Sequence, residues 1–217
     1  MTLRVGVLAS GSGTNLQAIL DGCRDGDLAA EVAVVVVNVP DAKAKDRALA
    51  AGVPALVVDH RAFGSREDFD RAVLAALKLH RVDLVCLAGF MRLLSPVLVE
   101  AYQNKILNIH PALLPAYPGL HAQRQALEGG ARFTGVTVHL VDAGTDTGPI
   151  LLQAVAPVLP TDDEATLSAR LRALEHRLYP AAVKLFAEGR VRVEGRKVTI
   201  TGVSWPDPAA ALVSPAP

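Results

Sequence analysis

Short apolar runs of strand length alternate with amphipathic segments along the first half of the chain. The apolar runs cover residues 3–9, 31–38, 54–59, 82–89 and 105–110, and the amphipathic segments cover 14–24, 43–51 and 67–80. This alternation predicts βαβ units. The strand VAVVVV is apolar on both faces, which is typical of a parallel sheet covered by helices on both sides.

The pattern changes after Gly135. GVTVHLV and GPILLQAVAPV predict two antiparallel strands joined by a polar loop, followed by a helix over 164–188 and a hairpin, RVRVEGRKVTI, that turns at Glu194–Gly195. The predicted fold is therefore α/β: a mostly parallel, doubly wound, Rossmann-like sheet with an antiparallel C-terminal extension, in three αβα layers. We expect one domain over 1–203 and a flexible Pro/Ala-rich tail over 204–217.

The charge balance favours a small-molecule ligand. Lys and Arg number 22, as do Asp and Glu, so the net charge of +0 gives no field that attracts nucleic acid or an anionic membrane. No apolar run approaches the roughly 18 residues of a membrane span, and two cysteines without metal spacing favour a reducing compartment, so we expect a cytoplasmic protein. The six histidines are scattered, and we predict no metal site.

The stretch VGVLASGSGTNLQAIL, residues 5–20, passes from a strand pattern through small residues to a helix pattern. One interpretation is purely structural: Gly11 and Gly13 allow a tight turn from strand to helix and have no role in binding. A dinucleotide fingerprint needs glycine at position 16, where Leu16 stands, and an acidic residue at the end of the second strand, where Asn38 stands. A Walker A loop needs a lysine that this stretch lacks. The sequence favours a helix N-terminus that binds one phosphate monoester through backbone N–H groups, without a cation.

Asn108 and His110 lie two residues apart in KILNIHP, so both side chains project from one face of a strand that Pro111 ends. Ligand crevices of open α/β sheets form at the carboxyl ends of parallel strands, where this pair lies. A single histidine is more often structural, but the amide neighbour and the position favour a functional pair. An amide and an imidazolium can both donate to an oxygen that gains negative charge.

The loop DAGTDTG, residues 142–148, carries Asp142 and Asp146 among glycines. Turn chemistry alone explains this composition. If the loop folds back on the strand that carries His110, a carboxylate there would favour the imidazolium and orient its ring. The loop is therefore a candidate part of the same site.

Four segments together resemble the phosphoribosylglycinamide formyltransferase family of folate-dependent formyltransferases. They are residues 10–20, LAGFMRLLSP at 87–96, LNIHPALLPAYPG at 107–119 and DAGTDTGPILLQ at 142–153, and the resemblance runs from about residue 3 to 200. It implies transfer of a formyl group from the co-substrate 10-formyltetrahydrofolate to the amine of 5-phosphoribosylglycinamide, in purine (IMP) biosynthesis. It also implies small-molecule partners and a monomer or homodimer.

The resemblance assigns roles to residues of this sequence. The matching catalytic residues are Asn108, His110 and Asp146, and the matching substrate-binding residues are Gly13, Thr14, Asn15 and Glu175. The matching folate-binding residues are Arg66, Met91, Arg92, Leu93, Leu94, Asn108, Asp142, Ala143, Gly144, Thr145 and Asp146. Departures from the family pattern at Ala112, Leu140 and Ala143 leave the three catalytic matches untouched.

Other functions stay open on the sequence. A formyltransferase that acts on methionyl-tRNA normally adds an RNA-binding domain, for which the residues after 200 leave no room. A formyltetrahydrofolate hydrolase normally has an N-terminal regulatory domain, whereas the first strand here begins by Leu3. A folate- or phosphate-binding module without catalysis and a dinucleotide-binding regulator are the alternatives from other classes.

Overall fold

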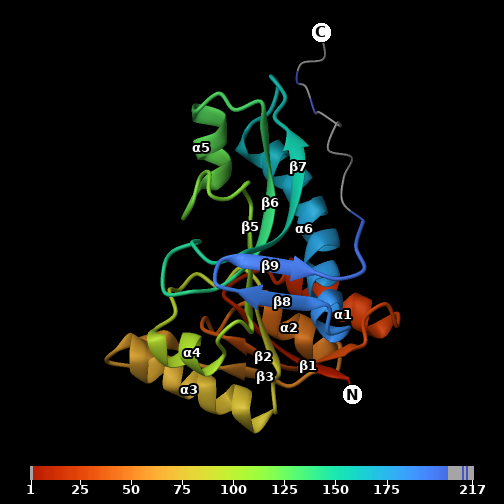
Figure 1. Cartoon of the computed structure of the whole chain (residues 1–217). Coiled ribbons are helices and arrows are strands. Elements are labelled where there is room, and N and C mark those ends of the chain that lie inside the picture. Colours follow the sequence, from red (N-terminus) through yellow and green to blue (C-terminus); the bar gives the residue numbers. More distant parts are fainter. Residues whose placement is uncertain (1, 205–211, 213, 215–217) are drawn as a thin grey trace.

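The computed structural model of the chain describes residues 2–204, 212 and 214 (Figure 1). Its elements are β1 (Leu3–Ala9), α1 (Thr14–Arg24), β2 (Ala30–Val37), α2 (Lys43–Ala50), β3 (Ala55–Val57), a 3₁₀ turn η1 (His60–Ala62), α3 (Arg66–Leu79), β4 (Leu84–Leu87), α4 (Pro96–Ala101), β5 (Ile106–His110), α5 (Ala122–Glu128), β6 (Phe133–Leu140), β7 (Ile150–Pro157), α6 (Glu164–Ala187), β8 (Val191–Glu194) and β9 (Lys197–Ile200).

The central sheet has seven strands in the order β3-β2-β1-β4-β5-β6-β7. The pairs among β1 to β5 are parallel, whereas β6 runs antiparallel to β5, and β7 antiparallel to β6. Strands β8 and β9 form a separate antiparallel hairpin. The predicted α/β fold with an antiparallel extension is confirmed.

Alternate residues of each central strand face two different helical layers. Val5 and Val7 of β1 belong to the apolar cluster that includes residues of α1, α2 and α6. Leu8 belongs to the second cluster, with Phe69 of α3 and Leu98 of α4. Because side chains alternate along a strand, the run of β-branched residues seen in the sequence buries both faces of the sheet and gives three layers.

The boundaries of the predicted elements lie within two residues of the observed ones, but α4, α5 and η1 were not predicted, and β4 has four residues rather than the predicted eight. Strand β3 has three residues rather than the predicted six, because this edge strand pairs with β2 only over Ala55–Val57. The turn of the C-terminal hairpin is Gly195–Arg196, one residue later than predicted, because Glu194 pairs with Lys197. The predicted tail falls mostly outside the described residues, so the division into a domain and a tail stays a prediction. No helix of the described residues is long and apolar enough to cross a membrane.

Tyr179 fastens α6 to the middle of the sheet. Its side chain is fully buried, and its hydroxyl lies 3.0 Å from the carbonyl oxygen of Leu87 and 2.9 Å from that of Leu107. These carbonyls belong to the neighbouring parallel strands β4 and β5, which end at the candidate site. The register of α6 against those strand ends therefore depends on a buried polar contact as well as on apolar packing.

We predict that Tyr179→Phe lowers the free energy of unfolding by about 1–3 kcal/mol, because the Leu87 and Leu107 carbonyl oxygens lose a buried hydrogen-bond donor. Urea denaturation measures this loss. Tyr102→Phe is the matched control, since the Tyr102 hydroxyl makes one longer contact, 3.2 Å from the Val82 carbonyl oxygen. An equal or greater loss in the control would contradict the role given to Tyr179.

Candidate functional site

The loops after β1 and β4 are joined at the carboxyl end of the sheet. The Ser10 backbone N–H donates to the Gly89 carbonyl oxygen at 3.1 Å, and the Met91 N–H donates to the Ser10 hydroxyl oxygen at 2.8 Å. The Ser10 hydroxyl in turn donates to Asn38 Oδ1 at 2.6 Å. Ser10 and Asn38 therefore bind each other and the backbone, as structural groups of the loop.

Gly13 shapes the start of α1. Its φ is +69°, and a Cβ atom there would lie 2.7 Å from the Cα of Ala44, so the position requires glycine. Counting from the start of α1, Gln17 is the first residue whose backbone N–H donates to a carbonyl oxygen, that of Gly13, at 2.9 Å. Among the described contacts, none uses the N–H groups of Thr14 and Asn15. They remain available to an anion at the positive end of the helix dipole.

A cavity of about 340 Å³ opens beside this loop. Its wall includes Ser10 to Asn15 on one side and Ile109 and Pro111, the neighbours of His110, on the other. Asn15 Nδ2 donates to Glu175 Oε2 at 2.9 Å, whereas the buried Asn15 Oδ1 atom has no partner among the described residues. The cavity thus holds an amide oxygen and a carboxylate that can accept hydrogen bonds, next to N–H groups that can donate them.

Arg172 also lines this cavity, and the sequence analysis missed it. The sequence led us to expect an anion site without a cation, whereas an exposed guanidinium lines the cavity that the loop forms. Arg172 and Glu175 are three residues apart on α6, and residues at that spacing share one face of a helix. The sequence therefore indicated that Arg172 lies on the same helix face as Glu175. That this face is turned toward the loop depends on the packing of α6 against α1.

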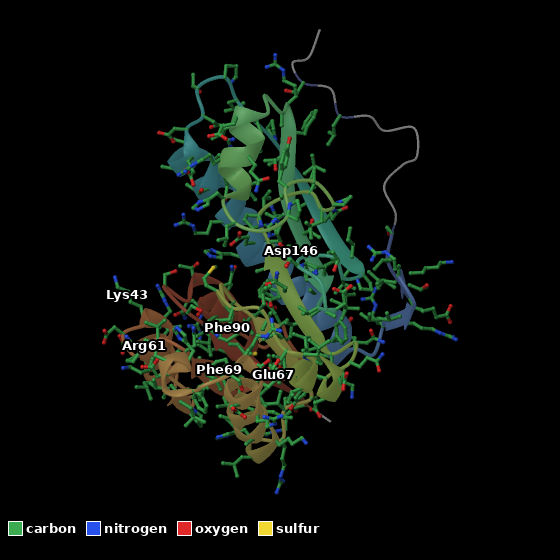
Figure 2. All side chains as sticks on the ribbon, turned by 90° about the vertical axis from the view of Figure 1, so that its left-hand side faces the viewer. Lys43, Arg61, Glu67, Phe69, Phe90 and Asp146 are labelled. Carbon is green, nitrogen blue, oxygen red and sulfur yellow. The ribbon has the colours of Figure 1, made fainter. Side chains whose placement is uncertain are left out.

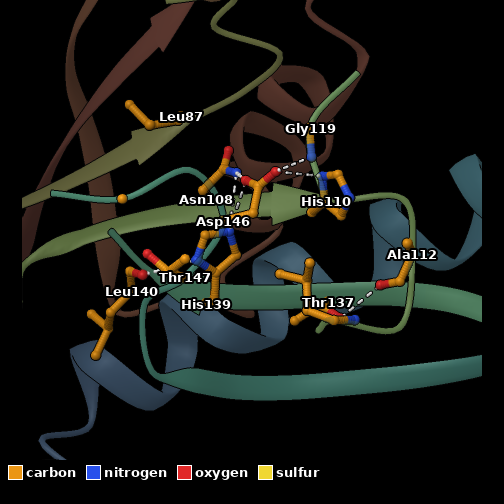
Figure 3. A network of polar contacts seen from close by, with 12 residues as sticks. Leu87, Asn108, His110, Ala112, Gly119, Thr137, His139, Leu140, Asp146 and Thr147 are labelled. Carbon is orange, nitrogen blue, oxygen red and sulfur yellow. Dashed lines mark hydrogen bonds and ion pairs between the residues drawn. The ribbon is translucent and has the colours of Figure 1, made fainter. Parts of the chain in front are cut away.

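Asn108, His110 and Asp146 meet at the end of β5 (Figure 3). Asn108 Nδ2 lies 3.4 Å from Asp146 Oδ1, and His110 Nδ1 lies 3.4 Å from Asp146 Oδ2. The amide and the imidazole therefore converge on one carboxylate. The two-residue spacing predicted only that Asn108 and His110 share a face of the strand, and the fold of the 142–148 loop brings Asp146 to them.

Asp146 is held inside the molecule with little exposure to water. Its φ is +54°, its side chain is 12% exposed, and Oδ2 accepts the backbone N–H of Gly119 at 2.8 Å. Burial by itself raises the pKa of this carboxyl. The contacts with His139 and the Gly119 N–H outweigh burial, and the charge of His110 adds to them, so the pKa of Asp146 lies below its usual value.

Both ring nitrogens of His110 face hydrogen-bond acceptors. Nε2 lies 2.8 Å from the carbonyl oxygen of Tyr117, which can only accept, so Nε2 carries a hydrogen. Nδ1 faces the Asp146 carboxylate. The doubly protonated imidazolium is the form that can donate to both groups, and the side chain is buried at 6% exposure.

His139 completes this cluster, and the sequence analysis missed it. It pairs with Asn108 across β5 and β6 and is 2% exposed. Its Nδ1 lies 2.8 Å from the carbonyl oxygen of Leu140, so in the neutral ring Nε2 is unprotonated and accepts from Asn108 Nδ2 at 3.1 Å. His139 therefore turns the nitrogen of the Asn108 amide toward Asp146. A polar residue within the apolar run VTVHLV could have indicated a functional role for His139. Its pairing with Asn108, however, depends on the register of β5 against β6.

The rest of the 142–148 loop folds on itself. Asp142 Oδ1 accepts the Gly144 N–H at 3.0 Å and the Thr147 hydroxyl at 2.6 Å, and residues 143–145 are exposed. A Cβ atom at Gly148 would lie 1.8 Å from the Leu140 carbonyl oxygen, so the loop closes through glycine. Its outer part presents backbone groups to solvent beside Asp146.

The segment after β4 presents apolar side chains to solvent. Met91 and Leu93 are 67% and 57% exposed, whereas Leu94 packs against the α3-side core. The Arg92 guanidinium lies 5.2 Å from the centre of the Phe69 ring, and Phe69 stacks with Phe90 (Figure 2). The segment is thus anchored from α3 and leaves apolar surface free.

Arg66 is the remaining predicted folate-binding residue. It begins α3, and its guanidinium is 3.9 Å from Glu67. Within the described part of the chain no contact joins it to the 91–94 segment or to the 142–148 loop. A role for Arg66 stays a prediction.

The described residues contain no group of three or more His, Cys, Asp or Glu side chains that could hold a metal ion. Cys23 and Cys86 are free, and burial raises the pKa of the Cys86 thiol to about 12. Neither thiol is poised as a nucleophile.

The chain also matches a known protein family. Residues 3–183 match the model of the formyl transferase family, and the chain belongs to this family. It is 42% identical over 204 residues to phosphoribosylglycinamide formyltransferase of Escherichia coli, covering 94% of this chain and 96% of that protein.

Two further relatives are similar to this chain, one in a longer protein and one in a solved structure. The trifunctional purine biosynthetic protein adenosine-3 of Drosophila melanogaster is 49% identical over 188 residues, which are 86% of this chain but 14% of the fly protein. The crystal structure of glycinamide ribonucleotide transformylase 1 from Symbiobacterium toebii superposes with a TM-score of 0.90 at 57% identity, covering 92% of this chain and 94% of that one. The chain therefore spans about a seventh of the fly relative and nearly all of the bacterial ones.

The low pKa of Asp146 predicts a specific loss of stability in acid. A carboxyl whose pKa is lower in the folded state stabilises the fold above its unfolded pKa, and this stabilisation is lost as the pH falls through the folded value. The free energy of unfolding should thus fall more steeply between about pH 5 and 3 in the wild type than in Asp146→Asn.

Urea denaturation at several pH values measures this difference. Other aspartates with lowered pKa values, such as Asp59 and Asp162, are present in both proteins, so their contributions cancel. Parallel pH profiles for the two proteins would contradict the lowered pKa of Asp146.

Proposed function

We propose that the protein transfers a formyl group from 10-formyltetrahydrofolate to the amine of 5-phosphoribosylglycinamide, in purine (IMP) biosynthesis. The products are formylglycinamide ribonucleotide and tetrahydrofolate. One observation carries the proposal: a single cavity is lined by the Ser10–Asn15 loop and by Ile109 and Pro111, which flank His110 in the sequence. A phosphate bound at the loop would direct the rest of a small ribonucleotide toward the Asn108, His110 and Asp146 cluster.

The phosphate end of the acceptor fits the start of α1. The unpaired N–H groups of Thr14 and Asn15 can donate to phosphate oxygens, and the Arg172 guanidinium adds a positive charge. Glu175 and Asn15 Oδ1 offer acceptors to ribose hydroxyl groups. The chemistry of this wall of the cavity therefore suits a phosphorylated sugar.

The segment after β4 and the 142–148 loop fit the flat ring of a folate. Met91 and Leu93 offer exposed apolar surface, which an aromatic ring covers favourably. The exposed backbone of residues 143–145 offers N–H and carbonyl groups that match the polar edge of a pterin. Asp142, Ala143, Gly144 and Thr145 would hold the co-substrate in this way, together with Arg92 and Leu94 of the segment after β4.

The chain's own groups then act on the reacting atoms. The acceptor amine attacks the formyl carbon, and the formyl oxygen gains negative charge. Asn108 Nδ2 and His110 Nδ1 each lie 3.4 Å from an Asp146 carboxylate oxygen, a long contact, so a formyl oxygen that enters between them would accept these two hydrogen bonds in place of Asp146. Asp146 keeps the imidazole charged and oriented, and a proton moves from the amine to the folate nitrogen through His110 or through water held by Asp146.

We predict that Asn108→Ala and His110→Ala each lower kcat by about 10²–10³-fold or more, because each change removes one donor to the oxyanion. Asp146→Asn should also lose turnover while it still binds the phosphate substrate, since the Ser10–Asn15 loop is intact. Steady-state kinetics and equilibrium binding of phosphoribosylglycinamide measure these effects.

Circular dichroism and thermal unfolding serve as the control that each variant folds. Near-wild-type turnover in folded His110→Ala would exclude the mechanism. Loss of ribonucleotide binding in Asp146→Asn would show that this aspartate belongs to the acceptor site and not to the transfer step.

We predict that Arg172→Ala raises the KM for phosphoribosylglycinamide by about tenfold, because a charge-assisted hydrogen bond to phosphate is lost, and leaves the KM for the folate unchanged. Arg177→Ala is the matched control, since Arg177 is exposed on the same helix but does not line the cavity. The proposal for Arg172 is wrong if the two variants have the same KM, or if the folate KM rises in parallel.

A further inference from the structure

The hairpin formed by β8 and β9 touches the candidate site although it lies outside the family match, which ends at residue 183. Arg196, in its turn, donates from Nη1 to the carbonyl oxygen of Thr147 at 2.7 Å. Thr147 directly follows Asp146 in the loop between β6 and β7. Figure 1 shows the tip of this hairpin, in blue, beside that loop.

The position of the hairpin is fixed by the core. Val191, Val193 and Val198 pack against the large apolar cluster, and Ile200 belongs to it. These residues alternate with exposed ones, as expected for a two-stranded ribbon with one buried face. Gly195, the first residue of the two-residue turn, has φ +58°, the region that tight hairpin turns require there. The turn is therefore held at a set place, and Arg196 extends from it.

The 142–148 loop has few other external supports on its outer side. The contacts of Asp142 stay within the loop, and residues 143–145 are exposed. The Asp146 side chain is held from inside by Gly119, His110 and His139. Arg196 differs from these groups because it holds the backbone from outside, across 49 residues of sequence.

We propose that Arg196 is a positioning residue for the formyl donor: by binding the Thr147 carbonyl, it keeps the 142–148 loop in the conformation that receives the folate. This inference rests on the proposed function, because it concerns the same loop. Asp146 keeps its inner contacts when Arg196 is lost, so the effect falls on binding of the folate more than on the transfer step.

The test compares three variants in the full-length protein. Arg196→Ala should raise the KM for 10-formyltetrahydrofolate by about three- to tenfold, while kcat and the KM for phosphoribosylglycinamide change less than about twofold. Arg196→Lys, which can still donate to the carbonyl, should restore most of the affinity. Arg192→Ala should match the wild type, because Arg192 is 78% exposed on the same hairpin and pairs with Glu194.

Hydrogen exchange of the 142–148 amides is a readout that does not depend on turnover. These amides should exchange faster in Arg196→Ala than in the wild type or Arg192→Ala, with the thermal unfolding midpoint unchanged. Equal kinetics and equal exchange in Arg196→Ala and Arg192→Ala would overturn the inference, as would a fall in kcat that accompanies general destabilisation. Absence of formyl transfer in the wild type would instead refute the proposed function, and the exchange experiment would still decide whether Arg196 holds the loop.

Discussion

The buried carboxylate of Asp146 is the group on which the rest of the site depends. A carboxylate with little access to water is stable only when donors and positive charge surround it. Here the Gly119 N–H, the Asn108 amide and the His110 ring supply them. Asn108 is fixed by strand pairing and His110 by strand pairing and the Tyr117 carbonyl, so the carboxylate links β5 to the loops that carry Gly119 and Asp146.

The sheet explains why both halves of the site lie together. Parallel strands β1, β4 and β5 end at the same edge, and their following loops carry the phosphate-binding candidates, the apolar segment and the polar cluster. The antiparallel strand β6 then returns the chain to that edge, which allows the 142–148 loop to fold over β5. A bimolecular transfer needs two ligands held with their reacting atoms in contact, and this arrangement offers two adjacent walls for them.

Residues that the sequence analysis missed share one property: their roles arise from pairing between distant elements. His139 stands beside Asn108 because of the register of β5 against β6. Arg172 reaches the cavity because α6 packs on α1, and Arg196 reaches Thr147 because the hairpin packs on the core. Each looks like an ordinary strand or surface residue in the sequence, since local pattern carries no information about such contacts.

The sequence by itself determined the α/β class, most element boundaries, and Asn108, His110 and the 142–148 loop as candidates. These follow from short-range rules: side-chain alternation, the effect of proline on a strand end, and the turn chemistry of glycine and aspartate. Only the tertiary structure decided how Asp146 is oriented, which atom of Asn108 faces it, and which cation stands at the α1 cavity. Those features depend on strand register and helix packing, which are set by the burial of the whole core and not by any local stretch of the chain.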